Sequence, residues 1–343
     1  MSTDLQARVS PAPPEERGAA RDAAGEERSR AQRAPVALDG VSRAYPAARR
    51  PRRAGAGARS ARAGGRSARA GGRSARAGTG ADGAVQALAE VSLRARAGEL
   101  IAIVGPSGCG KSTLLELVCG LQQPDRGTVA CEPAVLMPQR DLLLPWLSAL
   151  DNAALALRIA GHPRAEARAR AGALLDELGL EGFQRARPHE LSGGMRQRIA
   201  FARTLLSGRP VLCLDEPFGA LDAITRAQLQ EWLAAALARA LRASPGADPL
   251  AGRPRTVVLV THDVEEAALL ADRVIVLSPR PGRVTAEIEL RAPRPRSRTD
   301  SDVLDARERA LAALGLGAPA QDVRERAPEH DPSPAGARAG RRL

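Results

Sequence analysis

The stretch that decides the fold is Leu100-Ile101-Ala102-Ile103-Val104-Gly105-Pro106-Ser107-Gly108-Cys109-Gly110-Lys111-Ser112-Thr113. Its first five residues are apolar and predict a buried strand, and an amphipathic pattern over Lys111–Cys119 predicts a helix. The residues between them fit G-x-x-x-x-G-K-[ST]. In this pattern the glycines let backbone N–H groups surround phosphate oxygens, and the helix N-terminus adds a favourable dipole. The strand, the loop and the helix together predict a phosphate-binding loop.

Lys111 is the only lysine among the 51 basic residues of the chain. Arginine replaces lysine easily on a surface, but not where a compact ammonium on a flexible stem is needed. We therefore expect Lys111 to reach the β- and γ-phosphates of a nucleotide, and the Ser112 hydroxyl to bind Mg²⁺. The alternative is a glycine-rich turn without a ligand, which chance produces in about one chain in a hundred of this length.

Apolar strands alternate with amphipathic helices along the rest of the chain. Besides 100–104, the expected strands are a short one within 36–45 and strands at 211–214, 256–260 and 274–277; the further helices are 164–178, 193–206, 223–243 and 264–271. Such alternation predicts an α/β fold with a mainly parallel sheet and helices on its faces. Regular structure is expected to resume at Val85 and to end near Leu290.

The composition limits where the protein works. The chain has 343 residues, of which 44% are hydrophobic, so it can build one substantial core or two small domains. It offers no run of roughly 18 apolar residues and no apolar signal core. We expect a cytoplasmic protein that reaches a membrane only through a partner. The four cysteines form no C-x-x-C pair, which favours buried thiols in a reducing compartment.

Several segments are expected to be disordered: residues 1–34, a loop at about 243–255 and the tail after about 315. Residues 46–84 hold three copies of Arg-Ser-Ala-Arg-Ala-Gly, which start at Arg59, Arg66 and Arg73. This composition predicts a flexible basic insertion. The insertion could bind phosphate backbones of nucleic acid or anionic lipid, and the default expectation is a solvated loop with no dedicated role.

Two carboxylates follow another apolar strand, in Val211-Leu212-Cys213-Leu214-Asp215-Glu216-Pro217. We expect Asp215 to hold the Mg²⁺ shell and Glu216 to polarise the attacking water as a general base. Alone, the pattern fits a strand followed by an acidic turn equally well. Beside a phosphate-binding loop, the catalytic interpretation is favoured.

The segment Leu191-Ser192-Gly193-Gly194-Met195-Arg196-Gln197-Arg198 resembles the LSGGQ signature of ABC ATPases, with Met195 in place of the usual Gln. A Ser-capped helix would explain the helix here but not the double glycine at its start. The resemblance implies a P-loop NTPase fold with an ABC-type ATPase core at 35–292, a small antiparallel β subdomain, a helical subdomain at 140–200 and a C-terminal extension at 293–343. It also implies that Ser192, Gly193 and Gly194 face a γ-phosphate held by a second copy, in a head-to-tail dimer with two shared ATP sites.

Four more residues resemble elements of the same family. Gln139 is similar to the Q-loop glutamine, which senses Mg²⁺, and His262 to the switch histidine that contacts the γ-phosphate. Asp222 is similar to the D-loop aspartate at the dimer seam. Tyr45 resembles the A-loop aromatic residue that stacks on adenine, but it directly precedes the basic insertion. A tyrosine exposed at the end of a strand is the alternative.

The branch of the family is indicated by Arg140-Asp141-Leu142-Leu143-Leu144-Pro145-Trp146 with Leu150-Asp151-Asn152, and by Ser278-Pro279-Arg280-Pro281-Gly282-Arg283. Both resemble the ATPases of importers for nitrate, sulfonates, taurine and thiamine precursors. This implies an ATP-hydrolysing subunit that works with a membrane permease and, indirectly, a solute-binding protein. Leu142, Leu143, Leu144 and Trp146 either receive the permease or pack the helical subdomain. The alternative function is a soluble ABC ATPase acting on nucleic acid. Two features count against it: the chain has a single cassette, and the segment after Gln139 resembles a permease-docking site.

Overall fold

The computed structural model describes residues 34–46, 84–242 and 255–316 of the chain. The expected N-terminal tail, basic insertion, late loop and C-terminal tail lie outside the described residues, apart from a residue or two at their edges. The two described segments that flank the insertion are Val36–Tyr45 and Val85–Ala95, and they pair with each other as antiparallel strands.

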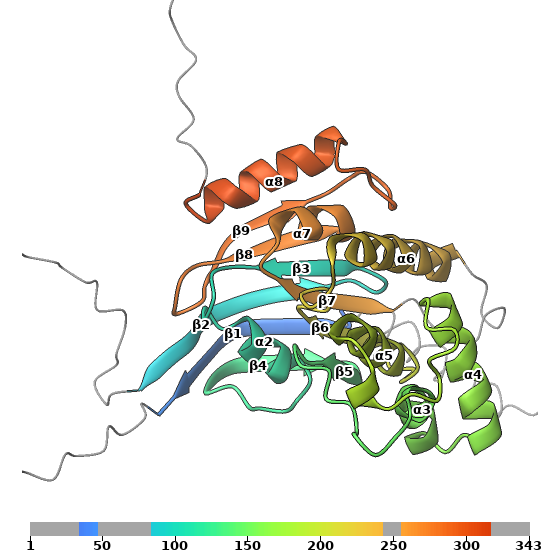
Figure 1. The fold of residues 1–343 in the computed structure, drawn as a ribbon. Coiled ribbons are helices and arrows are strands. Elements are labelled where there is room, and N and C mark those ends of the chain that lie inside the picture. Colours follow the sequence, from blue (N-terminus) through green and yellow to red (C-terminus); the bar gives the residue numbers. More distant parts are fainter. Residues whose placement is uncertain (1–33, 47–83, 243–254, 317–343) are drawn as a thin grey trace, which may run out of the picture.

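Two sheets form the centre of the molecule (Figure 1). The larger has the order β5-β6-β7-β3-β8-β9, and every neighbouring pair is parallel except β8 and β9. The smaller is antiparallel, with the order β2-β1-β4. In the larger sheet the strands are β3 (Leu100–Val104), β5 (Ala134–Met137), β6 (Val211–Asp215), β7 (Thr256–Thr261), β8 (Arg273–Leu277) and β9 (Val284–Glu289); in the smaller they are β1 (Val36–Tyr45), β2 (Val85–Ala95) and β4 (Arg126–Cys131). The expected α/β class with a mainly parallel sheet and an antiparallel subdomain is confirmed.

The central strand β3 is apolar throughout because both of its faces are covered. Leu100, Ala102 and Val104 belong to one core cluster, while Ile101 and Ile103 belong to the other. Successive side chains of a strand point to opposite faces, so a strand buried on both sides is a continuous apolar run rather than an alternating one. This places the end of β3, where the phosphate loop begins, in the middle of the sheet.

Helix α2 (Lys111–Val118) lies between the two sheets, because its buried leucines pack in one cluster with apolar residues of both. The other face of the large sheet is covered by α6 (Ala223–Arg242), α7 (Val264–Leu270) and α8 (Ser301–Ala313). To one side lies the helical subdomain (Figure 1), made of α3 (Ala149–Ile159), α4 (Arg164–Glu177), the short 3-10 helix η1 (Pro188–Glu190) and α5 (Gly193–Leu205).

The expectation that regular structure ends near Leu290 is wrong. Helix α8 begins beyond it and packs on β9 and α7, with Val303, Ala306 and Ala310 in the main core cluster. The carboxylate of Asp302 fixes the approach to the helix by accepting the backbone N–H groups of Arg291 and Ala292, at 2.6 and 2.7 Å. The first part of the C-terminal extension therefore belongs to the core of the fold.

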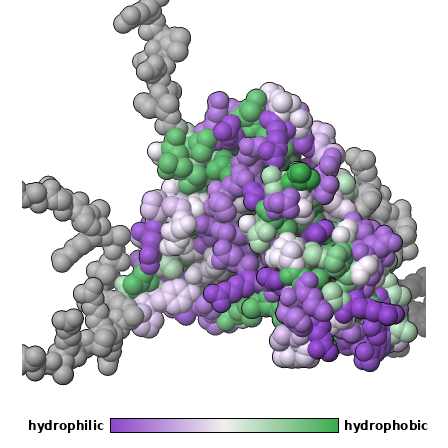
Figure 2. Space-filling model, viewed as in Figure 1, coloured by the Kyte–Doolittle hydropathy of each residue, from purple (hydrophilic) through white to green (hydrophobic). Residues whose placement is uncertain are grey.

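None of the described helices is long and apolar enough to span a membrane. Figure 2 shows a mainly hydrophilic face with scattered apolar patches, one of them where α8 ends. The thiols are free: Cys109 and Cys213 are buried as expected, whereas Cys119 and Cys131 are half-buried.

Candidate nucleotide site

The phosphate loop leads from the end of β3 into α2, as the sequence predicts. Gly110 has a φ of +107°, and a Cβ there would lie 2.6 Å from the Leu88 side chain and 2.8 Å from the Ala87 carbonyl oxygen. Only glycine fits this position. Lys111 is buried, and its Nζ donates to the carbonyl oxygens of Gly105 and Pro106, at 2.8 and 3.2 Å. The lysine is thus folded back over the loop that it follows.

A cavity of about 360 Å³ opens over this loop. Its lining includes ten residues that the sequence proposes for the site: Tyr45, Ser107, Gly108, Gly110, Lys111, Ser112, Thr113, Gln139, Asp215 and Glu216. Gly105, Pro106 and Cys109 belong to the same loop but do not line the cavity. Residues from the phosphate loop, the end of β5 and the end of β6 meet at one place because the parallel strands end at the same edge of the sheet. Tyr45 joins them from β1 of the antiparallel sheet.

Glu216 lies at the centre of the polar contacts in this cavity. Its Oε2 accepts the amide of Gln139 at 3.0 Å, and its Oε1 lies 3.4 Å from Nδ1 of His262. Its backbone has a φ of +48°, a left-handed conformation that is uncommon for a residue other than glycine and that occurs often at functional sites. The backbone N–H of Glu216 is held by the carbonyl of Val260 at 2.9 Å. The three residues proposed as catalytic are therefore brought together, although they come from three distant parts of the chain.

Asp215 lies deeper than Glu216 and is 8% exposed. Burial raises the pKa of its carboxyl group, a hydrogen bond with the Ser112 side chain lowers the pKa, and the charge of Glu216 raises it again. The charge of Lys111 lowers the pKa of Asp215, but burial has the largest effect and the pKa stays above its ordinary value. Asp215 and Ser112, the two residues expected to bind Mg²⁺ on either side of the loop, lie in contact.

Tyr45 ends β1 at the rim of the cavity, beside Val85 and Ala87. Its hydroxyl lies 3.2 Å from the Thr113 hydroxyl and donates to Gln122 Oε1 at 3.0 Å. The guanidinium of Arg43 lies 5.3 Å from the centre of the tyrosine ring. These contacts hold the tyrosine half-buried at the end of β1, and its stacking on adenine stays a prediction.

The signature residues and Asp222 do not line this cavity. Ser192 caps α5 by accepting the N–H of Met195 at 3.2 Å, and Asp222 accepts the N–H groups of Ile224 and Thr225 at 3.1 and 3.0 Å. A Cβ on Gly194 would lie 3.2 Å from the side chain of Leu221. The signature segment thus packs against the segment before Asp222, and away from the phosphate loop of its own chain.

Comparison with known proteins agrees with this geometry. A family profile described as ABC transporter matches residues 88–219. The aliphatic sulfonates import ATP-binding protein SsuB 1 of Rhodococcus jostii is 43% identical over 234 residues, which cover 66% of this chain and 86% of that protein. The chain belongs to the ABC transporter ATP-binding proteins. The taurine import ATP-binding protein TauB of Sinorhizobium fredii is 44% identical over 219 residues, which cover 61% of this chain and 77% of that protein.

Solved structures lead to the same family. A dimeric structure of the ATP-binding cassette MJ0796, in a post-hydrolysis state with ADP and Pi, matches with a TM-score of 0.57 and 27% identity, and the match covers 75% of this chain and 99% of that one. This ABC protein therefore binds nucleotide and is an ATPase. The alternative of an ATPase acting on nucleic acid is not supported, and the Arg repeats that favoured it lie outside the described residues.

The sequence analysis did not single out three residues that have distinctive positions in the structure of this ABC ATPase. Arg280 lines the cavity. Asn152 is fully buried, and its side chain bonds the backbone of Leu144, Leu147 and Ser148. Glu266 is buried in α7, just after His262. The sequence marks Asn152 and Arg280 only through the segments that contain them, and it gives no signal for Glu266.

Proposed function

We propose that this ABC ATPase energises the import of a small sulfonate-like solute through a separate permease, with Glu216 as the base that activates water. Glu216 lines the cavity together with Gln139 and Lys111, and its contacts with Gln139 and with His262, which lies outside the lining, carry the assignment of the site. The names of the relatives, which import aliphatic sulfonates and taurine, carry the choice of solute class.

The residues around the phosphate loop explain how ATP would be held. Backbone N–H groups of residues 105–113 and the N-terminus of α2 surround the β-phosphate. Lys111 exchanges its present bonds with the carbonyls of Gly105 and Pro106 for phosphate oxygens. Tyr45, fixed by Thr113 and Gln122, offers its ring to adenine.

The donor set around Asp215 fits Mg²⁺. Ser112, Gln139 and Asp215 offer oxygen ligands, which this ion prefers. Among the described residues no group of three His, Cys, Asp or Glu side chains could hold a metal alone, which suits an ion bound chiefly through nucleotide phosphates and water. When bound, Mg²⁺ neutralises phosphate charge. The carboxyl group of Asp215, which lines the cavity beside Ser112, would supply the matching negative charge.

Hydrolysis follows from the position of Glu216. Its carboxylate accepts a proton from water, the water oxygen attacks the γ-phosphorus, and the bond to the β-phosphate oxygen of the leaving ADP breaks. Gln139 holds Oε2 of this carboxylate. The His262 side chain is 65% exposed and lies beside Oε1, so it is free to turn toward the γ-phosphate.

The site needs a second copy to be complete. Ser192, Gly193 and Gly194 form the N-terminus of α5 but do not line the cavity of their own chain. In a head-to-tail dimer, this N-terminus of one copy meets the γ-phosphate held by Lys111 of the other, and Asp222 lies at the seam. The dimeric state of the related cassette MJ0796 supports this arrangement.

The surface after Gln139 is suited to a permease. Leu142 and Trp146 are 59% and 68% exposed, whereas Leu143 is buried. Asn152 holds this segment from beneath. Two arginines of α5 reach it as well: Arg196 pairs with the Asp141 carboxylate at 3.0 Å, and Arg203 donates to the Leu142 carbonyl at 2.9 Å. These contacts join the signature helix α5 to the segment after Gln139. A solute-binding protein would act on the complex from the far side of the permease.

The test is Glu216→Gln, which keeps the size of the side chain and removes the base. We expect ATP binding within a few fold of the wild-type value and a loss of ATP hydrolysis of about 10²-fold or more. Phosphate release and nucleotide titration measure the two quantities. Glu265→Gln, which changes a half-exposed carboxylate on α7, is the matched control and should keep its turnover. Wild-type turnover in Glu216→Gln would remove the base assignment.

A further inference from the structure

Arg280 stands at the rim of the nucleotide cavity, on the turn between β8 and β9. It lines the cavity together with Ser107 and Gly108 of the phosphate loop. One of its guanidinium nitrogens, Nη2, lies 3.8 Å from the position that a Cβ on Gly108 would occupy. The guanidinium thus lies over the turn of the loop whose backbone N–H groups receive phosphate.

The turn that carries Arg280 is fixed to the site. Gly282 donates its N–H to the carbonyl of Ala87 at 2.8 Å and accepts the N–H of Ala89 at 3.0 Å. A Cβ on Gly282 would lie 2.2 Å from the carbonyl oxygen of Cys109, so the turn rests directly on the phosphate loop. The Ser278 hydroxyl closes the turn from inside, with bonds of 2.9 Å to the Pro281 carbonyl and 3.0 Å from the Arg283 N–H. The backbone of Arg280 therefore needs no rearrangement to present its side chain.

The charged residues that line the cavity indicate a role for the Arg280 side chain. The lining contains two carboxylates, Asp215 and Glu216, and two cations, Lys111 and Arg280. A nucleotide adds several negative charges to a site that is otherwise balanced. Among the described residues Arg280 has no ion-pair partner, whereas Arg283 on the same turn pairs with Glu90 at 2.6 Å. A guanidinium fork suits phosphate oxygens, which it can bind through two parallel hydrogen bonds.

We propose that Arg280 binds the phosphate groups of the nucleotide and is the second cation of the site beside Lys111. The proposal rests on the nucleotide site described above and adds a contact from the β8–β9 turn. Arginine is the default basic residue of this chain, so its type alone indicates nothing. Its fixed position over the phosphate loop and its lack of another acidic partner indicate the role.

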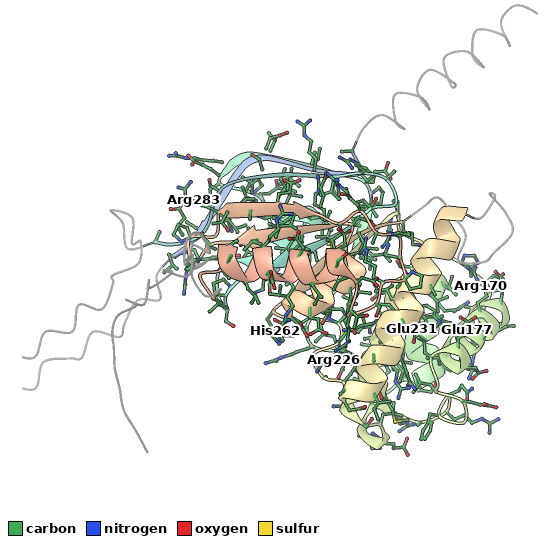
Figure 3. All side chains as sticks on the ribbon, turned by 90° about the horizontal axis from the view of Figure 1, so that it is seen from above. Arg170, Glu177, Arg226, Glu231, His262 and Arg283 are labelled. Atoms are coloured by element: carbon green, nitrogen blue, oxygen red, sulfur yellow. The ribbon has the colours of Figure 1, made fainter. Side chains whose placement is uncertain are left out.

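The experiment compares Arg280→Ala, Arg280→Lys and the control Arg283→Ala. Arg283 belongs to the same turn but does not line the cavity, and Figure 3 shows it at the end of the molecule opposite Arg170 and Glu177 of α4. Calorimetry with ADP should show affinity weakened roughly 10- to 100-fold in Arg280→Ala, as the loss of a charge-assisted hydrogen bond predicts. Arg280→Lys should recover part of the loss, and Arg283→Ala should match the wild type. Adenosine, measured by displacement of a fluorescent nucleotide, should bind all four proteins equally.

Three results would overturn the proposal. Unchanged ADP affinity in Arg280→Ala would show that the guanidinium does not touch phosphate. If that variant were defective only in ATP-driven dimer formation, Arg280 would contact the second copy of the chain and not the phosphates. Equal losses in Arg280→Ala and Arg283→Ala would show that both merely support the turn. An equal loss for adenosine would mean a general distortion of the site. Absence of ADP binding in the wild type would instead contradict the proposed function, so the two failures are distinct.

Discussion

Glu266 is a buried carboxyl group whose ionisation should reduce the stability of the protein near neutral pH. It is 5% exposed, and its Oε1 has no hydrogen-bond partner. Burial raises its pKa from 4.5 to about 8, and repulsion by Asp263 adds to the shift. The hydrogen bond with Thr261 and the attraction of Arg226 on α6 act in the opposite direction without cancelling it. Figure 3 shows Arg226 and His262 on the same side of the molecule.

The sign and size of the effect follow from this shift. The folded state binds the proton more tightly than the unfolded state, so the contribution of Glu266 to stability is present below pH 4.5 and is lost as the pH rises through 8. Between pH 6 and 8 mainly the unfolded state has released this proton. The stability then falls by about 1.4 kcal/mol for each pH unit, which gives a loss of about 2 kcal/mol over this range. Glu266→Gln cannot titrate, so it should lose about 2 kcal/mol less than the wild type over this range.

Urea unfolding of the nucleotide-free protein at pH 6 and pH 8 measures the difference. Tryptophan fluorescence is the signal, since Trp232 packs edge-on against Phe201 with 5.9 Å between the ring centres. The contributions of other titrating groups to the pH dependence of stability cancel when the variant is compared with the wild type. Glu265→Gln is the control, because this half-exposed neighbour pairs with Arg298 at 2.8 Å and its variant should follow the wild-type pH dependence. Parallel stability curves for the wild type and Glu266→Gln would refute the reasoning.

Two further predictions concern the walls of the nucleotide cavity. Tyr45→Ala should weaken ATP binding by about 5- to 10-fold through loss of ring stacking, whereas Tyr45→Phe should bind nearly as the wild type does; calorimetry decides, and equal weakening by both variants would show that the hydroxyl contacts with Thr113 and Gln122 matter instead. Gly282→Ala forces a Cβ to within 2.2 Å of the Cys109 carbonyl and should weaken ATP binding by about tenfold or more, since overpacking costs about 1–3 kcal/mol. Gly172→Ala on α4, where a Cβ meets only the Leu150 side chain at 3.7 Å, is the control and should leave ATP binding unchanged. Wild-type ATP affinity in Gly282→Ala would contradict the close packing of the β8–β9 turn on the phosphate loop.

The parts of the site that the sequence predicts are those set by local patterns. Leu100–Val104 is apolar because both faces of β3 are covered, and the loop to Lys111 follows directly from it. The same holds for β6, which ends at Asp215, and for Glu216 directly after it. The structure of such segments can be predicted locally, because burial on both faces and a glycine-rich turn at the end of a strand leave few alternative structures.

The parts that the sequence does not predict depend on contacts between distant segments. Helix α8 was missed because only Val303, Ala306 and Ala310 of it are buried, and two of these are alanines among charged residues. The place of Tyr45 is decided by Thr113 and Gln122, which lie far along the chain. Arg280 resembles every other arginine until the turn that carries it is packed against the phosphate loop.

The central claim is that the ATP site is shared, with Lys111 from one copy and Ser192 to Gly194 from another. Sedimentation of Glu216→Gln with ATP, alone and combined with Ser192→Glu, tests it most directly. The single variant should sediment as a dimer with ATP and as a monomer without it. The double variant should stay monomeric while it binds ADP as tightly as the single variant, because like charges at the γ-phosphate repel and its own half of the site is intact. A double variant that dimerises with ATP as the single variant does would contradict the shared site.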